Sequence, residues 1–267
     1  MNKERLDIFL VKNNYVPSRS KATELIKNGN VLVNDKVVLK NSFLVCNDYS
    51  ITIKESQLMN YVSRGGLKLQ KAIYEFNISL NDLTIMDIGA STGGFTSCAL
   101  NESAKKVYAI DVGSNQLHES LRNNSKVISI ENTNFKDIAK CNISDKIDMY
   151  VCDVSFISLR TIIDVLKKYD ENFTLIALFK PQFEVGKNNL NKNGVVKNEK
   201  IVISYINNFI NYLSFNNIGV INFTYSPIIG HHEGNIEYLF YLKSKEKSKI
   251  INYNSIIEES FKVLKVK

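Results

Sequence analysis

The sequence predicts an α/β protein in which a Rossmann-like, doubly wound parallel sheet follows a small α+β module. From residue 64 onward, short apolar runs alternate with stretches of helical periodicity, the pattern of strands and helices in such a sheet. The first 54 residues instead combine two short helical patterns with several short strands. A chain of 267 residues can hold one small and one medium domain. We expect a first domain over 1–55, a linker over 56–63 and a second domain over 64–267.

Two helices and a hairpin explain most of the N-terminal module. Apolar residues at helical spacing predict a helix over 4–13, and Ser18 or Ser20 can cap a second helix that ends before Gly29. The pair Asn34-Asp35 lies between two valine-rich runs and predicts a tight turn. Two further short strands are expected over 43–45 and 51–53.

The second domain begins with a predicted helix from Ser63 to about Phe76. Buried strands are then expected over 84–88, 106–110, 127–130, 149–152, 174–179, 220–225 and 236–242, with helices over 93–101, 159–167 and 199–213. The last two strands have no clear helix between them, so they could form an antiparallel hairpin at the sheet edge. Residues 188–198 are polar and contain a glycine, and we predict a long mobile loop there.

Positive charge is concentrated near the N-terminus. The net charge is +7, and residues 1–71 hold twelve Lys or Arg against six Asp or Glu. Because phosphate neutralisation supplies most non-specific affinity for nucleic acid, this basic region favours a polyanionic partner.

The cysteines, histidines and apolar runs exclude several classes of protein. The four cysteines are scattered, and neither they nor the three histidines form a metal-ligand pattern, so we expect free thiols and no metal. The N-terminus has charges inside its apolar stretch, unlike a signal peptide, and no apolar run approaches the ~20 residues that span a bilayer. We expect a cytoplasmic protein that does not enter a membrane.

A glycine-rich turn directly follows the first predicted strand of the second domain. Ser91 stands where the second glycine of G-x-G-x-x-G would be, and no lysine follows Gly94, which disfavours a dinucleotide site and a P-loop. The wider turn suits S-adenosylmethionine, which carries an amino-acid tail and a sulfonium in place of phosphates. Asp111 ends the second strand, where a carboxylate can bind both ribose hydroxyls. The expected cofactor-binding residues are Asp87, Gly89, Ala90, Ser91, Thr92, Gly93, Gly94, Phe95, Asp111 and Asp153.

Four charged residues are expected to gather at one edge of the sheet: Lys68, Asp153, Lys180 and Glu237. Asp153 and Lys180 each follow a strand, and the carboxyl ends of strands face the ligand crevice in such folds. One reaction that such a cluster suits is methylation of a ribose 2′-hydroxyl. This reaction requires alignment of the oxygen with the methyl group and removal of a proton from a very weak acid. A lysine can take that proton only when burial or a second cation lowers its pKa from ~10.4 toward neutrality. Lys180 is the expected base, with Lys68 as the second cation and the two carboxylates holding both.

Basic residues of the first domain are candidates for contact with RNA phosphates, which position a substrate without reading its sequence. They belong to Arg5-Leu6-Asp7 and to the second predicted helix, and one more follows the linker. The expected RNA-binding residues are Arg5, Arg19, Lys21, Lys27 and Arg64.

These motifs together resemble a known family. R-L-D, S-R-x-K-A and G-x-V-x-V-N resemble an S4 RNA-binding domain over residues 3–60, and 61–245 resemble an FtsJ-like, class I methyltransferase domain. The combination with V-S-R-G-G-x-K-L, DIGASTGGFT, DVSF, FKPQFE and GNIEY closely resembles the TlyA, or haemolysin-A-like, ribosomal RNA 2′-O-methyltransferases. The resemblance implies methylation of cytidine ribose in 16S or 23S ribosomal RNA, or both, with S-adenosylmethionine as donor. It places a Lys-Asp-Lys-Glu tetrad on the four charged residues named above.

Other functions stay open at this point. The chain could be an RNA-binding or ribosome-assembly factor without catalytic activity, although the glycine turn and all four tetrad positions are present. The haemolysin name suggests a membrane-active protein, for which the sequence has no spanning segment. We expect ribosomal RNA or ribosomal subunits as partners and a monomer as the oligomeric state.

Overall fold

The computed structural model describes residues 3–13, 15–16, 18–54, 61–230 and 234–264. The chain divides into a small unit, residues 1–63, and a large unit, residues 64–267. Of the predicted linker, 56–60 lie outside the described residues.

The small unit packs two helices against short strands. Its helices are α1 (Leu6–Lys12) and α2 (Arg19–Lys27), and its three-stranded sheet has the order β3-β2-β5, formed by Lys36–Val37, Val31–Val33 and Ile51–Ile53. A separate pair joins β1 (Glu4–Arg5) to β4 (Leu44–Val45). Buried aliphatic residues from both helices and from β2 form its core, among them Leu6, Leu25 and Val31, as the expected α+β module requires.

In the small unit, the residues predicted to cap α2 and to form the hairpin turn have these roles in the structure. The Ser18 side chain accepts a hydrogen bond from Lys21 N at 3.2 Å, so Ser18 rather than Ser20 is the N-cap of α2. Gly29 lies just past the Asn28 C-cap with a φ of +73°. The hairpin turn at Asn34 and Asp35 has positive φ at both positions, as a type I′ turn needs.

The large unit is built on a seven-stranded sheet with the order β11-β12-β10-β9-β6-β7-β8. Strand β12 is antiparallel to both of its neighbours, and the other neighbouring pairs are parallel. The predicted hairpin of the last two strands is therefore confirmed. In chain order the strands are Thr84–Ile88, Lys106–Ile110, Val127–Ile130, Met149–Cys152, Thr174–Phe179, Ile218–Tyr225 and Tyr238–Ser244 for β6 to β12.

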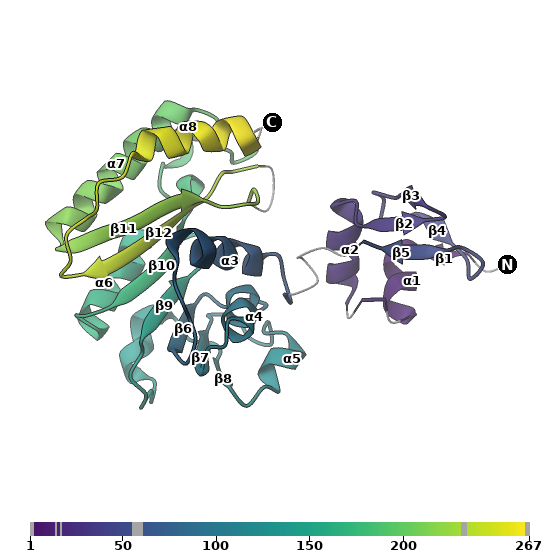
Figure 1. The fold of residues 1–267 in the computed structure, drawn as a ribbon, viewed down its shortest axis with the longest axis horizontal. Coiled ribbons are helices and arrows are strands. Elements are labelled where there is room, and N and C mark those ends of the chain that lie inside the picture. The colour runs from purple at the N-terminus through teal and green to yellow at the C-terminus, as the bar shows by residue number, and fades with distance from the viewer. Residues whose placement is uncertain (1–2, 14, 17, 55–60, 231–233, 265–267) are drawn as a thin grey trace. The chain divides into compact units, whose positions relative to one another are not determined.

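Helices cover both faces of this sheet (Figure 1). On one face α3 (Gly65–Phe76) packs against α4 (Gly94–Asn101), and Phe76 stacks on Tyr241 of β12. On the other face α6 (Leu159–Tyr169) and α7 (Glu199–Phe215) share a hydrophobic core with the alternate residues of the strands. The buried central strands β6, β9 and β10 and this two-sided cover confirm the predicted doubly wound α/β fold.

The structure adds three features to the predicted fold. A short helix α5 (Glu119–Arg122) follows β7, and a C-terminal helix α8 (Tyr253–Leu264) packs near α7 and β11. The polar segment 188–198 is held in place rather than loose. Val195 and Val196 are almost fully buried, and Asn191 accepts hydrogen bonds from the main-chain N–H groups of Asn193 and Val195.

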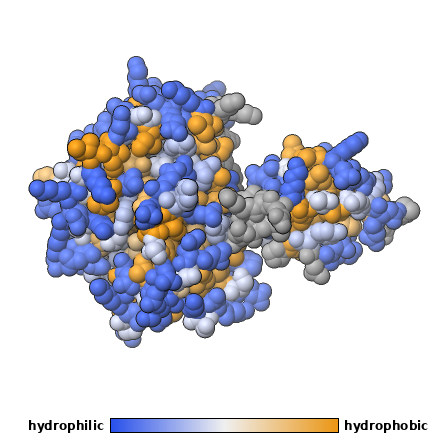
Figure 2. All heavy atoms as spheres, in the orientation of Figure 1, coloured by the Kyte–Doolittle hydropathy of each residue, from blue (hydrophilic) through white to orange (hydrophobic). Residues whose placement is uncertain are grey.

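The helices and the surface bear on the prediction that the chain has no membrane-spanning segment. Within the described part of the chain, no helix combines the length and apolar character that a membrane crossing requires. Hydrophilic side chains cover most of the face of the large unit seen in Figure 2.

Candidate active site

The turn after β6 approaches the segment after β9 closely. Gly89 has a φ of +81°, and a Cβ there would lie 2.9 Å from Val154 Cγ1. Gly93 has a φ of +93°, and a Cβ there would collide with Leu121 Cδ1 and lie 2.8 Å from Leu117 Cδ1. Glycine alone fits both positions, so the turn can lead directly into α4, whose N-cap is Gly93.

The other residues of the predicted cofactor turn differ in their access to solvent. Ala90, Gly94 and Phe95 are buried, whereas Ser91 and Thr92 are exposed at the tip. The tip therefore presents polar groups and main-chain atoms to solvent, while the base of the turn is fixed in the core.

Asp87 lies in β6, just before this turn, and its carboxylate is fully buried. Thr96 Oγ1 donates a hydrogen bond to Asp87 Oδ2 at 2.6 Å, whereas Oδ1 is buried and accepts none from the described residues. Burial, assisted by the charges of Asp153 and Asp111, raises the pKa of Asp87 to about 7. An oxygen in this state favours a positively charged or hydrogen-donating ligand group close by.

Asp111 connects the end of β7 to the glycine turn. Its Oδ2 accepts a hydrogen bond from Ser91 N at 2.8 Å, and its Oδ1 accepts one from Gly113 N at 2.7 Å. Each oxygen keeps a further lone pair for a hydroxyl donor. The next residue, Val112, is 67% exposed and offers an apolar surface that the sequence analysis did not identify.

The four predicted tetrad residues lie together in the structure. Lys68 Nζ is 2.7 Å from Glu237 Oε2 and 3.3 Å from Asp153 Oδ2. Lys180 Nζ is 2.6 Å from Asp153 Oδ1, so this carboxylate bridges the two ammonium groups. All four side chains are largely buried.

Strand register explains why residues so distant in sequence meet. Phe179 of β10 pairs with Tyr238 of the antiparallel strand β12, which places Lys180 beside Glu237. On its other side β10 runs parallel to β9, and the next residues after β9 bring Asp153 to the same edge. Lys68 reaches this edge from α3.

Opposite charges determine the ionisation of this cluster. Burial pushes the pKa of Asp153 upward, but Lys68 and Lys180 together lower it to about 2. Burial also pushes the pKa of Lys68 downward, but Asp153 and Glu237 outweigh this effect and raise it. Asp153 is therefore an anion and Lys68 a cation at neutral pH, as a fixed electrostatic frame requires.

Three residues beside Lys180 were missed by the sequence analysis. Lys180 Nζ donates a hydrogen bond to Ser155 Oγ at 2.9 Å. Phe156 is 90% exposed and has a φ of +65°, a strained backbone for an aromatic residue. Its ring centroid lies 5.0 Å from that of Phe183, whose centroid is 6.0 Å from Lys180 Nζ. The motif D-V-S-F contained the signal, since an aromatic residue follows the polar end of a strand.

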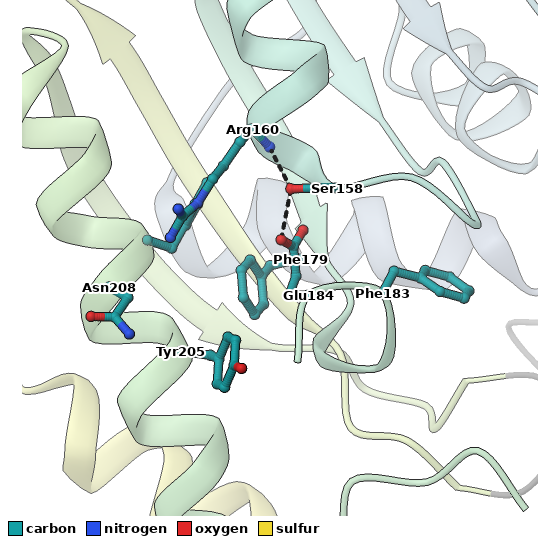
Figure 3. A pocket seen from close by; sticks show the side chains of 8 residues that line it. Ser158, Arg160, Phe179, Phe183, Glu184, Tyr205 and Asn208 are labelled. Atoms are coloured by element: carbon teal, nitrogen blue, oxygen red, sulfur yellow. Dashed lines mark hydrogen bonds between the residues drawn. The ribbon is translucent and has the colours of Figure 1, made fainter. Parts of the chain in front are cut away.

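A separate pocket of about 410 Å³ opens between α6 and α7 (Figure 3). Its wall includes Glu184, which accepts hydrogen bonds from Ser158 Oγ and from Leu159 N and so caps α6. Phe183 is shared between this pocket and the aromatic pair beside Lys180. No residue of the glycine turn and no member of the tetrad lines it, so it is not the predicted cofactor site.

In the small unit, one buried carboxylate orients two exposed arginines. Arg5 Nε lies 2.9 Å from Asp7 Oδ1, and Arg19 Nη2 lies 3.0 Å from Asp7 Oδ2. The hydrogen bond from Arg5 is the main reason that the pKa of Asp7 is lowered to about 2, and Arg19 adds to it. Both guanidinium groups keep donors free for an anion, which fits the predicted RNA contacts.

The other predicted RNA-binding residues differ among themselves. Lys27 is exposed at the end of α2, and Arg64 is half-buried at the N-cap of α3, one turn before Lys68. Lys21 needs a correction, because its side chain is 7% exposed and its Nζ donates to the Tyr61 carbonyl at 3.0 Å and lies 3.3 Å from Glu24 Oε2. An ammonium group buried in this way stabilises the small unit instead of facing solvent.

Among the described residues, no group of three or more His, Cys, Asp or Glu side chains is arranged to hold a metal ion. The described cysteines are all free thiols, namely Cys46, Cys98, Cys141 and Cys152.

Known proteins share both units of this chain. Residues 61–244 match the FtsJ-like methyltransferase family and residues 4–49 match the S4 domain. The chain is 42% identical to Hemolysin A of Brachyspira hyodysenteriae, over 88% of this chain and 98% of that protein. It is 39% identical to the 23S rRNA (cytidine-2'-O)-methyltransferase TlyA of Campylobacter jejuni, over 89% of this chain and 98% of that protein. A solved structure of a Streptococcus thermophilus protein named as a hemolysin has a TM-score of 0.76 and 34% identity, covering 99% of this chain and 98% of that one.

The match to the larger family spans more than two thirds of the chain and includes the glycine turn and the whole tetrad. The chain belongs to the FtsJ-like methyltransferase family and carries an S4 domain at its N-terminus.

Proposed function

We propose that this protein is a 2′-O-methyltransferase that transfers a methyl group from S-adenosylmethionine to cytidine ribose in 16S or 23S ribosomal RNA, or both. We further propose that it acts as a monomer in the cytoplasm. The observation that carries the proposal is the buried cluster in which Asp153 bridges Lys68 and Lys180. The names of the TlyA relatives support the choice of ribosomal RNA.

The residues around the glycine turn fit the cofactor. The unpaired Oδ1 of Asp87 suits the ammonium of an amino-acid tail, and Asp111 has lone pairs left for ribose hydroxyls. Val112 offers an apolar surface for an adenine ring. S-adenosylmethionine, when bound, supplies an activated methyl group on a sulfonium.

The tetrad's role in this proposal is to hold the 2′-hydroxyl and take its proton. Lys68 contacts two carboxylates, whereas Lys180 contacts one carboxylate that it shares with Lys68. Lys180 therefore has fewer anionic partners and is the better candidate for the base, and Lys68 remains the cation that keeps Asp153 in place. Ser155 fixes the Nζ of Lys180 by a hydrogen bond. Aligning the 2′-hydroxyl with the methyl group and removing its proton each raise the rate of methyl transfer by orders of magnitude.

Phe156 supplies a candidate contact for the target nucleotide. An exposed ring beside the base can stack on a nucleobase that has left its helix, because every base has an aromatic face. The two arginines on Asp7 would hold RNA phosphates at the small unit.

The decisive experiment replaces Lys180 with Ala. We expect single-turnover methyl transfer to ribosomal RNA to fall by about 10²–10⁴-fold while calorimetric affinity for S-adenosylmethionine is retained. Lys180→Arg should be equally inactive, since a guanidinium does not release its proton. Lys126→Ala is the control, because this lysine is exposed and forms no ion pair with another described residue. Near-normal transfer by Lys180→Ala would refute the role of base, and a wild-type protein without affinity for S-adenosylmethionine would refute the whole proposal.

The relative named Hemolysin A makes membrane lysis a second candidate. Purified wild-type protein and Lys180→Ala should be compared for dye release from lipid vesicles. Release by both proteins, without methyl transfer by either, would favour lysis over methylation.

A further inference from the structure

A lysine-bearing segment after β10, residues 187–200, is hydrogen-bonded to Asn235, two residues before Glu237 of the tetrad. Lys187, Lys192, Lys197 and Lys200 are exposed and form no ion pair with another described residue. We name residues 187–200 the lysine segment. Under the proposed function, its charges are available to RNA phosphates.

One buried side chain fastens this segment to the hairpin that carries Glu237. Asn235 is 3% exposed. Its Oδ1 accepts a hydrogen bond from Val196 N at 2.9 Å, and its Nδ2 donates one to the Gly194 carbonyl at 2.9 Å. Both ends of the amide are thus bound to the main chain of the lysine segment, about forty residues earlier in the sequence.

The main-chain carbonyl of Asn235 is also linked to Glu237, through Gly230. Gly230 N donates to the Asn235 carbonyl at 2.8 Å, and a Cβ on Gly230 would lie 2.7 Å from Glu237 Oε1. Gly230 therefore packs directly on the carboxylate that holds Lys68 at 2.7 Å. A continuous series of contacts therefore runs from the lysine segment through Asn235 and Gly230 to Glu237 and Lys68.

We propose that Asn235 is a positioning residue that couples RNA held by the lysine segment to the placement of Glu237 in the tetrad. The inference rests on the proposed function, because it needs RNA as the ligand of the lysine segment. It goes beyond that function by assigning a role to a residue that touches neither RNA nor the reacting atoms.

The test is a double-mutant cycle measured as single-turnover methyl transfer at saturating RNA and S-adenosylmethionine. We expect Asn235→Ala to lower the rate about tenfold while the Kd for RNA and for S-adenosylmethionine each change by less than about threefold. Lys192→Gln with Lys197→Gln should also lower this rate in the wild-type background. In the Asn235→Ala background the same pair should have almost no further effect, because the connection is already broken. Asn207→Ala, at an exposed position of α7, is the control.

Each outcome decides the inference. An unchanged rate in Asn235→Ala, or rate losses that simply multiply, would overturn it. If Asn235→Ala fails to fold, Asn235→Asp takes its place, since a carboxylate keeps an acceptor for Val196 N and loses the donor to Gly194. A wild-type rate in Asn235→Asp would then overturn the inference. Absence of methyl transfer in the wild-type protein would instead refute the proposed function.

Discussion

At the residue scale, Asp87 carries the clearest pH signature of the structure. Its pKa is raised from 3.8 to about 7 in the folded protein by burial, so the fold disfavours its charge. The unfolded chain releases this proton near pH 4, so unfolding becomes easier as the pH rises from about 4 to about 7. Above pH 7 the contribution is constant.

Asp87→Asn should therefore be more stable than the wild type at pH 8, by at most about 4 kcal/mol, because an amide has no ionisation to suppress. Near pH 4, the difference in the free energy of unfolding should shrink to the part that does not depend on pH. Thermal unfolding of both proteins without cofactor, from pH 4 to pH 8, measures the difference. A stability difference that is the same at every pH would contradict the assignment.

Phe156 is a second residue whose role can be isolated. Its ring is 90% exposed, so Phe156→Ala should leave the melting temperature nearly unchanged. Loss of one stacking contact should lower methyl transfer on RNA by about 5- to 150-fold. Phe156→Tyr keeps the aromatic face and should retain most of the activity. Wild-type rates in Phe156→Ala would exclude the ring from substrate binding.

The positions of some candidate site residues could be predicted from the sequence, and those of others could not. Lys180 and Asp153 were identifiable because each directly follows an apolar strand, and strand ends converge. The exposure of Phe156 could not be predicted, because it follows from a positive φ that an aromatic residue does not signal. The burial of Lys21 could not be predicted, because its partner is the carbonyl of Tyr61, which lies 40 residues away.

At the element scale, the strands of the large unit could be predicted closely. Mostly apolar runs identify β6, β7, β9 and β10, since strands buried on both faces carry few polar residues, of which Asp87 in β6 is one. The position of β12 between β10 and β11 could not be predicted, because strand order depends on pairing between distant segments. Helix α8 was missed, and its few fully buried residues give it a weak sequence signal.

Substitution of Gly93 tests the turn at the start of α4, and Gly186 elsewhere in the chain provides the control. Gly93→Ala forces a Cβ into Leu121 at a φ of +93°, so it should destabilise the large unit by more than about 2 kcal/mol and weaken S-adenosylmethionine binding. Gly186→Ala is the matched control, since Gly186 has a φ of +72° with no atom near a Cβ. It should cost only about 1 kcal/mol of backbone strain. Equal losses of stability in both variants, measured by chemical unfolding, would show that the collision is unimportant.

At the scale of the whole molecule, the proposed function separates the basic residues into exposed candidates for RNA binding and buried ones that hold the fold. Replacing Arg5 and Arg19 with Gln removes two exposed cations. The slope of log K against log salt for RNA binding should then become shallower by about 1.4 to 1.8. Lys21→Gln should leave this slope nearly unchanged and lower the melting temperature, because the Lys21 ammonium is buried. A slope change of the same size in Lys21→Gln would show that Lys21 reaches the RNA.

The insertion of β12 between β10 and β11 also sets the order in which the protein matures during synthesis. Glu237 precedes β12 directly, and β12 is the last strand of the sheet to leave the translating ribosome. We expect the S4 domain and the glycine turn to form on a nascent chain, whereas Lys68 gains Glu237 as its second carboxylate only after the end of β12 has been synthesised. Under the proposed function, an incompletely translated chain would bind ribosomal RNA but would lack the carboxylate that completes the tetrad.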